Sequence, residues 1–266
     1  DADYTAFLQW ALPRLGMRWP GFRRVRGQVC RRLGRRMGEL EVRDLADYRA
    51  LLETHPEEWI RLEGLCRISI SRFYRDQGVW RMLERDILAL LVERVRAHGD
   101  RRLRIWSAGC ASGEEPYTLA LLFAFSETLS GCRPEIVATD ADPHLLERAH
   151  RACYPGTSLR DLPDSWRAAF EPFGDEHCLS AEYRTPVSFL EQDMRRECPE
   201  GRFDLILCRN LVFTYFATAL QAAIARRLVE RLVPEGVLVL GIHESLPESI
   251  PMFVRERPWL YRKREE

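Results

Sequence analysis

The segment 105–117 constrains the fold of this chain more than any other part of the sequence. An apolar run typical of a strand leads into a glycine-bearing turn, and a helical pattern follows directly. A second apolar run, residues 136–139, ends at Asp140. Glycine lets the backbone come close to a ligand, and an acid at the end of the next strand can bind ribose hydroxyls. The two segments therefore predict a nucleoside-binding site on an α/β sheet.

The composition of the turn narrows the choice of ligand. It does not read Gly-x-Gly-x-x-Gly, and no Gly-Lys-Ser or Gly-Lys-Thr follows, so neither a dinucleotide site nor a P-loop is favoured. A nucleoside cofactor without a pyrophosphate remains, and S-adenosylmethionine is the leading candidate. The segment alone also fits a purely structural strand, turn and helix in some other α/β protein.

From about residue 103 short apolar strands alternate with longer helical patterns. We expect these elements in the order strand 103–108, helix 114–128, strand 135–139, helix 143–152, strand 203–208, helix 217–231 and strand 236–241. Such alternation predicts a parallel sheet covered by helices on both faces. Residues 154–200 interrupt the alternation, and short strands within 183–189 would form a small insertion on the main sheet.

Residues 1–66 have a helical pattern of their own. Apolar residues recur there at three- and four-residue spacing, as one stripe: Phe22, Val25, Val29, Leu33 and Met37. Arginines surround this stripe, and no acid occurs between Tyr4 and Gly38. The arginine-rich helix expected at 22–37 is either a solvated face or a docking surface for an acidic partner. No recognisable motif accompanies it, so nucleic acid is not favoured.

Composition sets the broad class of the protein. The 266 residues suffice for a small domain beside a larger one, and forty basic residues balance forty acidic ones. No apolar run is long enough to span a membrane, so we expect no membrane insertion. The eight cysteines form no C-x-x-C pair, and small buried hydrophobes explain them better than disulfides or zinc ligands. We therefore expect a reduced, cytoplasmic protein without a bound metal.

Polar residues, glycine and one methionine follow several of the expected strands and the apolar run 187–190. They are Gly109, Glu115, Asp140, Asp193, Met194, Arg209 and Asn210. Ligands of open α/β sheets bind outside the carboxyl ends of the strands, so these residues are candidates for one common site. Asp140 taken alone could instead be a helix N-cap, because Pro143 and a helix follow it.

Four stretches of the sequence resemble the chemotaxis receptor methyltransferase (CheR) family. They are Ser69 to Asp76, Ser107 to Tyr117, Thr139 to Asp142 and Cys208 to Asn210. The combination of Gly-Glu-Glu-Pro-Tyr with Cys-Arg-Asn is specific, and the resemblance extends over nearly the whole chain, including its arginine-rich helices.

The resemblance implies a fold and an activity. The fold is a class I methyltransferase domain, with a Rossmann-like doubly wound sheet, at 103–266. It carries an inserted β-subdomain at about 154–200. A small all-helical N-terminal domain at 1–66 precedes it, with a linker and helix at 67–102. The implied activity uses S-adenosylmethionine as methyl donor, yields S-adenosylhomocysteine and methylates glutamate carboxylates of a chemoreceptor-like protein.

The resemblance also implies roles for single residues near the methyl group. Ser69, Ser71 and Arg75 would face the methionyl end of the cofactor and the substrate. Arg75 and Tyr215 are the candidate catalytic residues, because a guanidinium can orient an acceptor carboxylate and the tyrosine would lie near the transferred methyl. Arg75 could instead form a salt bridge with Asp76 or with another surface acid, and Tyr215 could be a buried aromatic residue.

Further residues would bind the rest of the cofactor. Glu115 would contact it, with Glu114 as an open alternative, and Asp140 would hold the ribose. Asp193 and Met194 would flank the adenine. Arg209 and Asn210 would close the site.

This chain departs from the family in places that concern the acceptor. Four residues, 211–214, separate Asn210 from Tyr215, where the family has three, and one extra residue at a helix start rotates a side chain by about 100°. Either a local bulge absorbs the residue, or Tyr215 points elsewhere. His243 and Glu244 follow the last strand and are either a general base or structural. A small molecule or another protein therefore stays open as acceptor.

The arginine-rich helix allows a separate test. If it docks an acidic helical surface on a protein substrate, reversing the charge of Arg32 and Arg36 should weaken methylation of that partner and leave cofactor affinity nearly unchanged.

Overall fold

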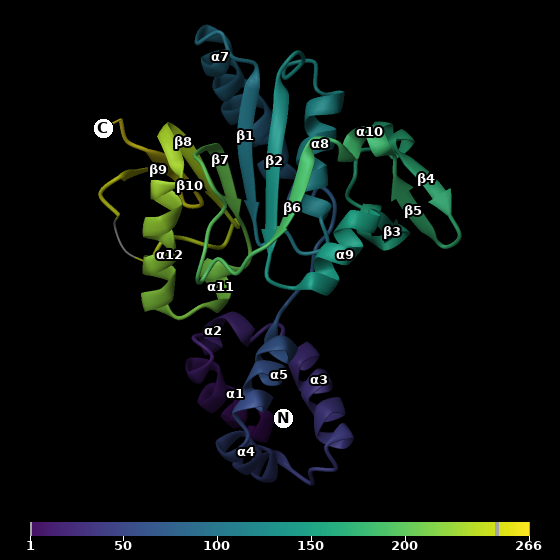
Figure 1. Ribbon diagram of the computed structural model, residues 1–266, viewed down its shortest axis with the longest axis vertical. Coiled ribbons are helices and arrows are strands. Elements are labelled where there is room, and N and C mark those ends of the chain that lie inside the picture. The colour runs from purple at the N-terminus through teal and green to yellow at the C-terminus, as the bar shows by residue number, and fades with distance from the viewer. Residues whose placement is uncertain (1, 248–249, 266) are drawn as a thin grey trace. The chain divides into compact units, whose positions relative to one another are not determined.

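The structure is a computed structural model that describes residues 2–247 and 250–265 (Figure 1). The chain forms two compact units. The helical unit contains the residues up to Ser69 together with Leu211–Gln221, and the sheet unit contains Ile70–Asn210 together with the residues from Ala222 onward. Residues 70–102, for which the sequence suggests a linker and helix, thus belong to the sheet unit.

The helical unit is built from short helices. They are α1 (Ala2–Arg14), α2 (Trp19–Phe22), α3 (Arg26–Glu39), α4 (Leu45–Thr54), α5 (Pro56–Cys66), α11 (Val212–Tyr215) and the start of α12 (Thr218–Glu230). The side chain of Asp44 caps α4 by accepting hydrogen bonds from the N–H groups of Ala46 and Asp47, each at 2.9 Å.

The apolar stripe of the arginine-rich region is split between two helices. Val29, Leu33 and Met37 are buried on α3, as their spacing predicts, whereas Phe22 ends α2. Val25 lies between them with φ −110° and ψ 0°, outside the helical range, so the expected single helix over 22–37 is wrong. Both helices bury their apolar side chains in the same unit, which explains why the spacing looked continuous.

The sheet unit is centred on seven strands in the order β6-β2-β1-β7-β8-β10-β9 (Figure 1). Their bounds are β1 Arg102–Ala108, β2 Arg133–Asp140, β6 Val187–Glu191, β7 Phe203–Cys208, β8 Leu232–Leu240, β9 Phe253–Arg257 and β10 Leu260–Lys263. Neighbours from β6 to β8 are parallel, while β10 and β9 add an antiparallel edge. The expected parallel sheet is confirmed and extended by this hairpin.

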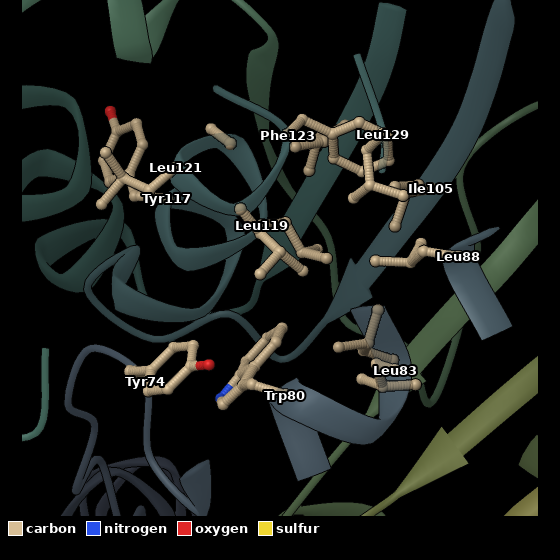
Figure 2. Packing of buried hydrophobic residues seen from close by; sticks show 14 of the residues in the cluster. Tyr74, Trp80, Leu83, Leu88, Ile105, Tyr117, Leu119, Leu121, Phe123 and Leu129 are labelled. Carbon is tan, nitrogen blue, oxygen red and sulfur yellow. The ribbon is translucent and has the colours of Figure 1, made fainter. Parts of the chain in front are cut away.

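Helices connect the strands and cover the sheet. They are α6 (Gln77–Met82), a π-helix (Leu83–Leu88), α7 (Ala89–Ala97), α8 (Glu114–Phe125), α9 (Pro143–Arg151), α10 (Ala181–Arg184) and α12. Figure 2 shows side chains from the π-helix, such as Leu83 and Leu88, beside Ile105 of β1 and Leu119 of α8. These side chains are almost fully excluded from water, which makes this layer the main hydrophobic core.

A second sheet of three strands lies between α9 and α10 in the sequence. Its order is β3-β5-β4, from β3 (Cys153–Pro155), β4 (Phe170–Phe173) and β5 (Glu176–Leu179). The segment 183–189, expected to contribute strands to an insertion, instead supplies the end of α10 and the start of β6. Since β6 pairs with β2, that strand belongs to the main sheet.

Two cysteines of the small sheet correct the expectation that none is disulfide-bonded. Cys153 and Cys178 are directly opposite each other on β3 and β5 and form a disulfide. A separation of 25 residues without a motif does not reveal this pairing, which arises from the register of two antiparallel strands. The other six cysteines carry free thiols, and Cys66, Cys110 and Cys208 among them are buried.

Residues 2–247 and 250–265 contain neither a candidate membrane span nor a candidate metal site. No helix there is long and apolar enough to cross a membrane. Nor does this part of the chain hold a group of three or more histidine, cysteine or acidic side chains arranged for a metal ion.

Candidate functional site

The carboxyl ends of five parallel strands lie along one edge of the main sheet. From β1 the chain reaches β2 and β6 on one side, and β7 and β8 on the other. The boundary between β1 and β7 is therefore a topological switch point, where open α/β sheets bind their ligands. Glycine or a polar residue ends or closely follows each strand here: Gly109, Asp140, Asp193, Arg209 and Gly241.

The turn after β1 depends on two glycines. Gly109 has φ +77°, and its N–H donates to the carbonyl of Thr139 at 2.8 Å, which ties the turn to β2. Gly113 has φ +92°, and a Cβ added there would lie 2.9 Å from Cβ of Ala149 and 3.1 Å from the hydroxyl of Tyr154. Only glycine combines this backbone conformation with such close packing.

Asp140 joins the turn to the end of β2. One carboxylate oxygen accepts from the N–H of Ala111 at 2.9 Å, and the other accepts from the N–H of Asp142 at 3.0 Å. Asp142, not Asp140, caps α9, because its side chain accepts from the N–H of His144 at 3.0 Å. The alternative that Asp140 is a helix N-cap is therefore wrong.

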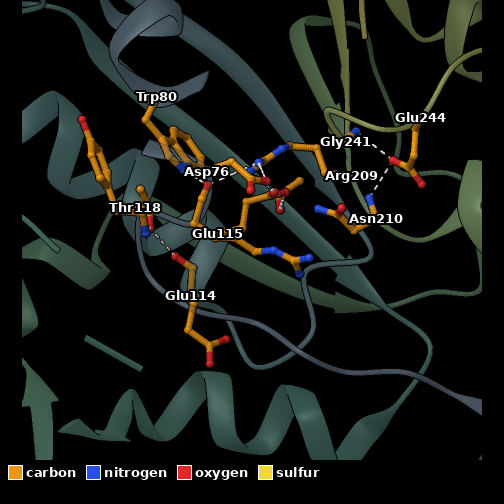
Figure 3. A network of polar contacts seen from close by, with 12 residues as sticks. Asp76, Trp80, Glu114, Glu115, Thr118, Arg209, Asn210, Gly241 and Glu244 are labelled. Atoms are coloured by element: carbon orange, nitrogen blue, oxygen red, sulfur yellow. Dashed lines mark hydrogen bonds and ion pairs between the residues drawn. The ribbon is translucent and has the colours of Figure 1, made fainter. Parts of the chain in front are cut away.

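Arg209 is the centre of a buried ionic cluster (Figure 3). Its side chain is 2% exposed and donates to Asp76 at 2.8 Å and to Glu115 at 3.2 Å. The guanidinium carbon lies 5.3 Å from the centre of the Trp80 ring, which adds a cation–π contact. Asp76 and Trp80 were not predicted as site residues, although Asp76 ends one of the stretches that resemble the CheR family.

The adjacent acids Glu114 and Glu115 have different partners. Glu115 accepts from the hydroxyl of Ser107 at 2.8 Å as well as from Arg209, so it faces the ends of β1 and β7. Glu114 accepts from the hydroxyl of Ser112 and also interacts with Ser71. Burial raises the pKa of both carboxyl groups, and Arg209 opposes that rise at Glu115. Of the two acids, Glu115 therefore lies among the strand ends.

The loop before α6 positions Arg75 and has an unusual backbone. Arg75 donates to the carbonyl of Ile70 at 2.9 Å, whereas Asp76 pairs with Arg209, so the proposed ion pair between Arg75 and Asp76 is not formed. Tyr74 and Asp76 have φ values of +55° and +63°. Such values are uncommon outside glycine, and strained residues of this kind concentrate at functional sites.

The segment after β6 holds Asp193 and Met194. Met194 is 5% exposed, as an apolar wall for an adenine requires. Asp193 is bound by the guanidinium of Arg195, with N–O distances of 2.9 and 2.7 Å. Burial raises the pKa of Asp193, but the hydrogen bonds from Arg195 outweigh it and hold the pKa below its ordinary value. Asp193 is thus an ionised residue that already has a partner within its own loop.

Comparison with known families decides the class of this site. Residues 69–257 match the model described as CheR methyltransferase, SAM binding domain, and residues 25–63 match CheR methyltransferase, all-alpha domain. The chain belongs to the CheR methyltransferase family. Its sheet unit is accordingly a class I methyltransferase domain that binds S-adenosylmethionine.

Individual CheR relatives are similar over most of this chain. A chemotaxis protein methyltransferase of Listeria monocytogenes is 36% identical over 185 residues, which are 69% of this chain and 68% of that protein. The Escherichia coli chemotaxis protein methyltransferase is 29% identical over 254 residues, 92% of this chain and 85% of that protein. An uncharacterized 104.1 kDa protein of Rhodobacter capsulatus is 34% identical over 240 residues, and the chain spans only 25% of its length.

Solved structures of other methyltransferases resemble the chain more distantly. The N-methyltransferase NodS of Bradyrhizobium japonicum, in complex with S-adenosyl-L-homocysteine, has a TM-score of 0.33 and 16% identity over 62% of this chain and 67% of its own. The glycopeptide N-methyltransferase MtfA, complexed with S-adenosylmethionine, has a TM-score of 0.36 and 15% identity over 67% and 66%. Likenesses of this size do not bear on the substrate.

The residues along the sheet edge fit the cofactor of the CheR family. S-adenosylmethionine offers a ribose diol, an adenine, a positive sulfonium and an amino-acid end that carries both charges. The site offers an anchored carboxylate in Asp140, a buried apolar side chain in Met194, and acid and guanidinium groups in Glu115 and Arg209. These groups are of the chemical kinds that the cofactor requires, and which of them contacts it stays a prediction.

Two residues that the CheR resemblance implies, Ser69 and Tyr215, belong to the helical unit. The ring of Tyr215 packs edge-on against Phe22 with 5.1 Å between ring centres, and its carbonyl accepts from the N–H of Arg18 at 2.8 Å. Leu211, in the segment with the extra residue, has φ −133° and ψ −82°, an irregular backbone. The roles of Ser69 and Tyr215 toward the methyl group stay predictions.

Proposed function

We propose that this chain transfers a methyl group from S-adenosylmethionine to glutamate carboxylates of a receptor-like protein in the cytoplasm. One observation carries the proposal: a chain of the CheR family has its glycine turn, Asp140, Glu115 and Arg209 at neighbouring strand ends of a single sheet. Relatives named chemotaxis protein methyltransferase support a protein acceptor.

The chemistry asks for alignment more than for a strong base. When bound, S-adenosylmethionine supplies an electrophilic methyl group on its sulfonium. A glutamate carboxylate is ionised at neutral pH, so the acceptor needs no deprotonation. Arg75 is held by the carbonyl of Ile70 through one nitrogen, and its planar group has further N–H donors that can orient an acceptor carboxylate. Alignment and exclusion of water then account for the rate.

The decisive experiment follows a labelled methyl group. The chain is incubated with S-adenosylmethionine labelled in that group and with membranes that contain chemoreceptors. Label on protein that mild base releases as methanol is expected for a carboxyl ester. Base-stable label on protein would contradict the glutamate acceptor, and efficient transfer to small molecules without a protein would favour a metabolite. Cofactor binding without transfer to any acceptor would indicate a binding module.

The exposed arginines of the helical unit suggest where the protein partner docks. Arg32 donates to the carbonyls of Leu65 and Arg67, and Arg36 pairs with Glu58, so both are bound to the chain itself. Reversing these two, as the sequence alone suggests, would disturb the helical unit. The exposed arginines of the region are Arg23, Arg24, Arg26, Arg31 and Arg35.

Arg31 and Arg35 are the sharper test of that surface, because they lie four residues apart on one face of α3. Changing both to glutamate should lower methylation of the protein acceptor about tenfold at low salt, and less at high salt, since exposed charges are screened. Affinity for S-adenosylhomocysteine and the unfolding midpoint should stay at wild-type values. Unchanged methylation would show that α3 does not contact the acceptor.

A further inference from the structure

Glu244 is a buried acid just beyond β8, at the carboxyl edge of the sheet. It is 5% exposed, and a buried carboxylate requires compensating partners. One of its oxygens, Oε2, accepts hydrogen bonds from the N–H of Asn210 and from the N–H of Gly241, each at 2.7 Å (Figure 3). These N–H groups follow β7 and β8, so one oxygen atom joins the ends of two neighbouring strands.

The surroundings of Glu244 are shaped for this contact. A Cβ added to Gly241 would lie 2.7 Å from Oε2 of Glu244 and 2.8 Å from Oδ1 of Asn210, so only glycine leaves room for the carboxylate. Asn210 has φ +58°, a left-handed conformation that is uncommon for residues with a side chain, although asparagine adopts it more readily than most. The bond from its N–H to Glu244 is a direct restraint on that conformation.

We propose that Glu244 is a positioning residue of the cofactor site, an inference that rests on the proposed function. It holds Asn210 in its left-handed conformation and thereby fixes the end of β7, from which Arg209 reaches Asp76 and Glu115. For Glu244, the pairing with backbone N–H groups favours the structural alternative over a general base, whereas the role of His243 stays open. His243 is exposed, while Glu244 is buried.

Two substitutions of Glu244 separate the effect of side-chain length from the effect of charge. Because a single oxygen accepts both bonds, glutamine can place its amide oxygen at the same point and keep both acceptor contacts without a charge. Aspartate keeps the charge, but its side chain is one methylene shorter and cannot reach both N–H groups without moving the backbone. A positioning role therefore predicts that Glu244→Gln resembles the wild type more closely than Glu244→Asp.

The experiment is calorimetric titration of the purified chain and its variants with S-adenosylhomocysteine, with thermal unfolding recorded on the same samples. We expect Glu244→Gln to bind within about threefold of wild type, and Glu244→Asp and Glu244→Ala to bind at least about tenfold more weakly. In turnover assays the same two variants should raise KM for S-adenosylmethionine more than they lower kcat. Ser245→Ala, at the exposed neighbouring position, is the matched control.

Four outcomes have defined meanings. Glu244→Asp binding as tightly as Glu244→Gln would overturn the inference, as would folded Glu244→Ala with wild-type affinity. If Glu244→Ala does not fold, the comparison of glutamine with aspartate still decides. A wild-type chain that does not bind S-adenosylhomocysteine would instead overturn the proposed function.

Discussion

Each unit of this molecule pairs an arginine with acids that are buried or partly buried, and the two clusters differ in what surrounds them. In the helical unit, Arg36 of α3 binds Glu58 of α5 with N–O distances of 2.9 and 2.7 Å, and Tyr48 of α4 donates to the same carboxylate at 2.8 Å. All three residues are on regular helices. The cluster therefore links the three helices to one another.

The cluster in the sheet unit takes Asp76 and Arg209 from loops, and only Glu115 lies on a helix, in the first turn of α8. Arg209 joins Asp76 and Glu115, and Asp76 and Asn210 both have positive φ values. The Nε atom of Arg209 is buried and has no hydrogen-bond partner in the described part of the chain. An arginine bound to acids thus holds helices together in one unit and lies at the candidate cofactor site in the other. The two clusters differ in the backbone that carries them, which is regular helix in the first and mainly irregular loop in the second.

Replacing each arginine by alanine should separate the two roles most strongly. Arg209→Ala leaves two partly buried acids without their cation, so we expect affinity for S-adenosylhomocysteine to fall about a hundredfold, or about 3 kcal/mol. Arg36→Ala should lower the unfolding midpoint but leave that affinity unchanged. Calorimetric titration and urea unfolding measure the two effects. Equal loss of affinity in both variants would show that the clusters do not have separate roles.

The pH dependence of the helical cluster provides a second, smaller test. Hydrogen bonds from Arg36 and Tyr48 lower the pKa of Glu58 below its ordinary value of 4.5, although burial acts in the opposite direction. A lowered folded-state pKa stabilises the unit above that ordinary value, and the stabilisation is lost as the pH falls through the lowered pKa.

Glu58→Gln should therefore cost about 2 kcal/mol of unfolding free energy at pH 7 and less below pH 4. Urea unfolding at several pH values measures both quantities. The control is Glu39→Gln, which changes an exposed partner of the same arginine and should cost less than about 0.5 kcal/mol. A loss for Glu58→Gln that does not change with pH would contradict the ionic account.

The strands at the centre of the sheet could be predicted from the sequence, and those at its edges could not. β1, β2 and β7 are almost continuous apolar runs because both faces are covered. β6 and β9 are edge strands with mostly exposed or half-exposed side chains, so their hydrophobic pattern is weak; the sequence suggests short strands within 183–189, which overlaps β6, and none at β9. The same limit hides the disulfide, which depends on the register of short strands.

Some residues of the candidate site could likewise be predicted from the sequence, and others could not. Residues directly after strands, such as Gly109 and Asp140, can be found because parallel topology brings their positions to one edge. Asp76 and Glu244 act through pairing with groups 133 and 34 residues away, and no spacing rule predicts such contacts. Sequence therefore indicates where a site of this kind lies more readily than which groups hold it in shape.

The smallest expected effects concern two glycines, one in the turn after β1 and one within a helix of the helical unit. Gly113→Ala places a side chain at φ +92° and 2.9 Å from Ala149, so it should lower the unfolding free energy by about 2 kcal/mol and weaken S-adenosylhomocysteine binding. Gly64 lies within α5, and an added Cβ there meets nothing within 4 Å. Because alanine favours helix, Gly64→Ala should stabilise the helical unit by about 0.5 kcal/mol without changing affinity. Urea unfolding and calorimetry of both variants measure this contrast, and stabilisation by Gly113→Ala would mean that the turn does not need its left-handed residue.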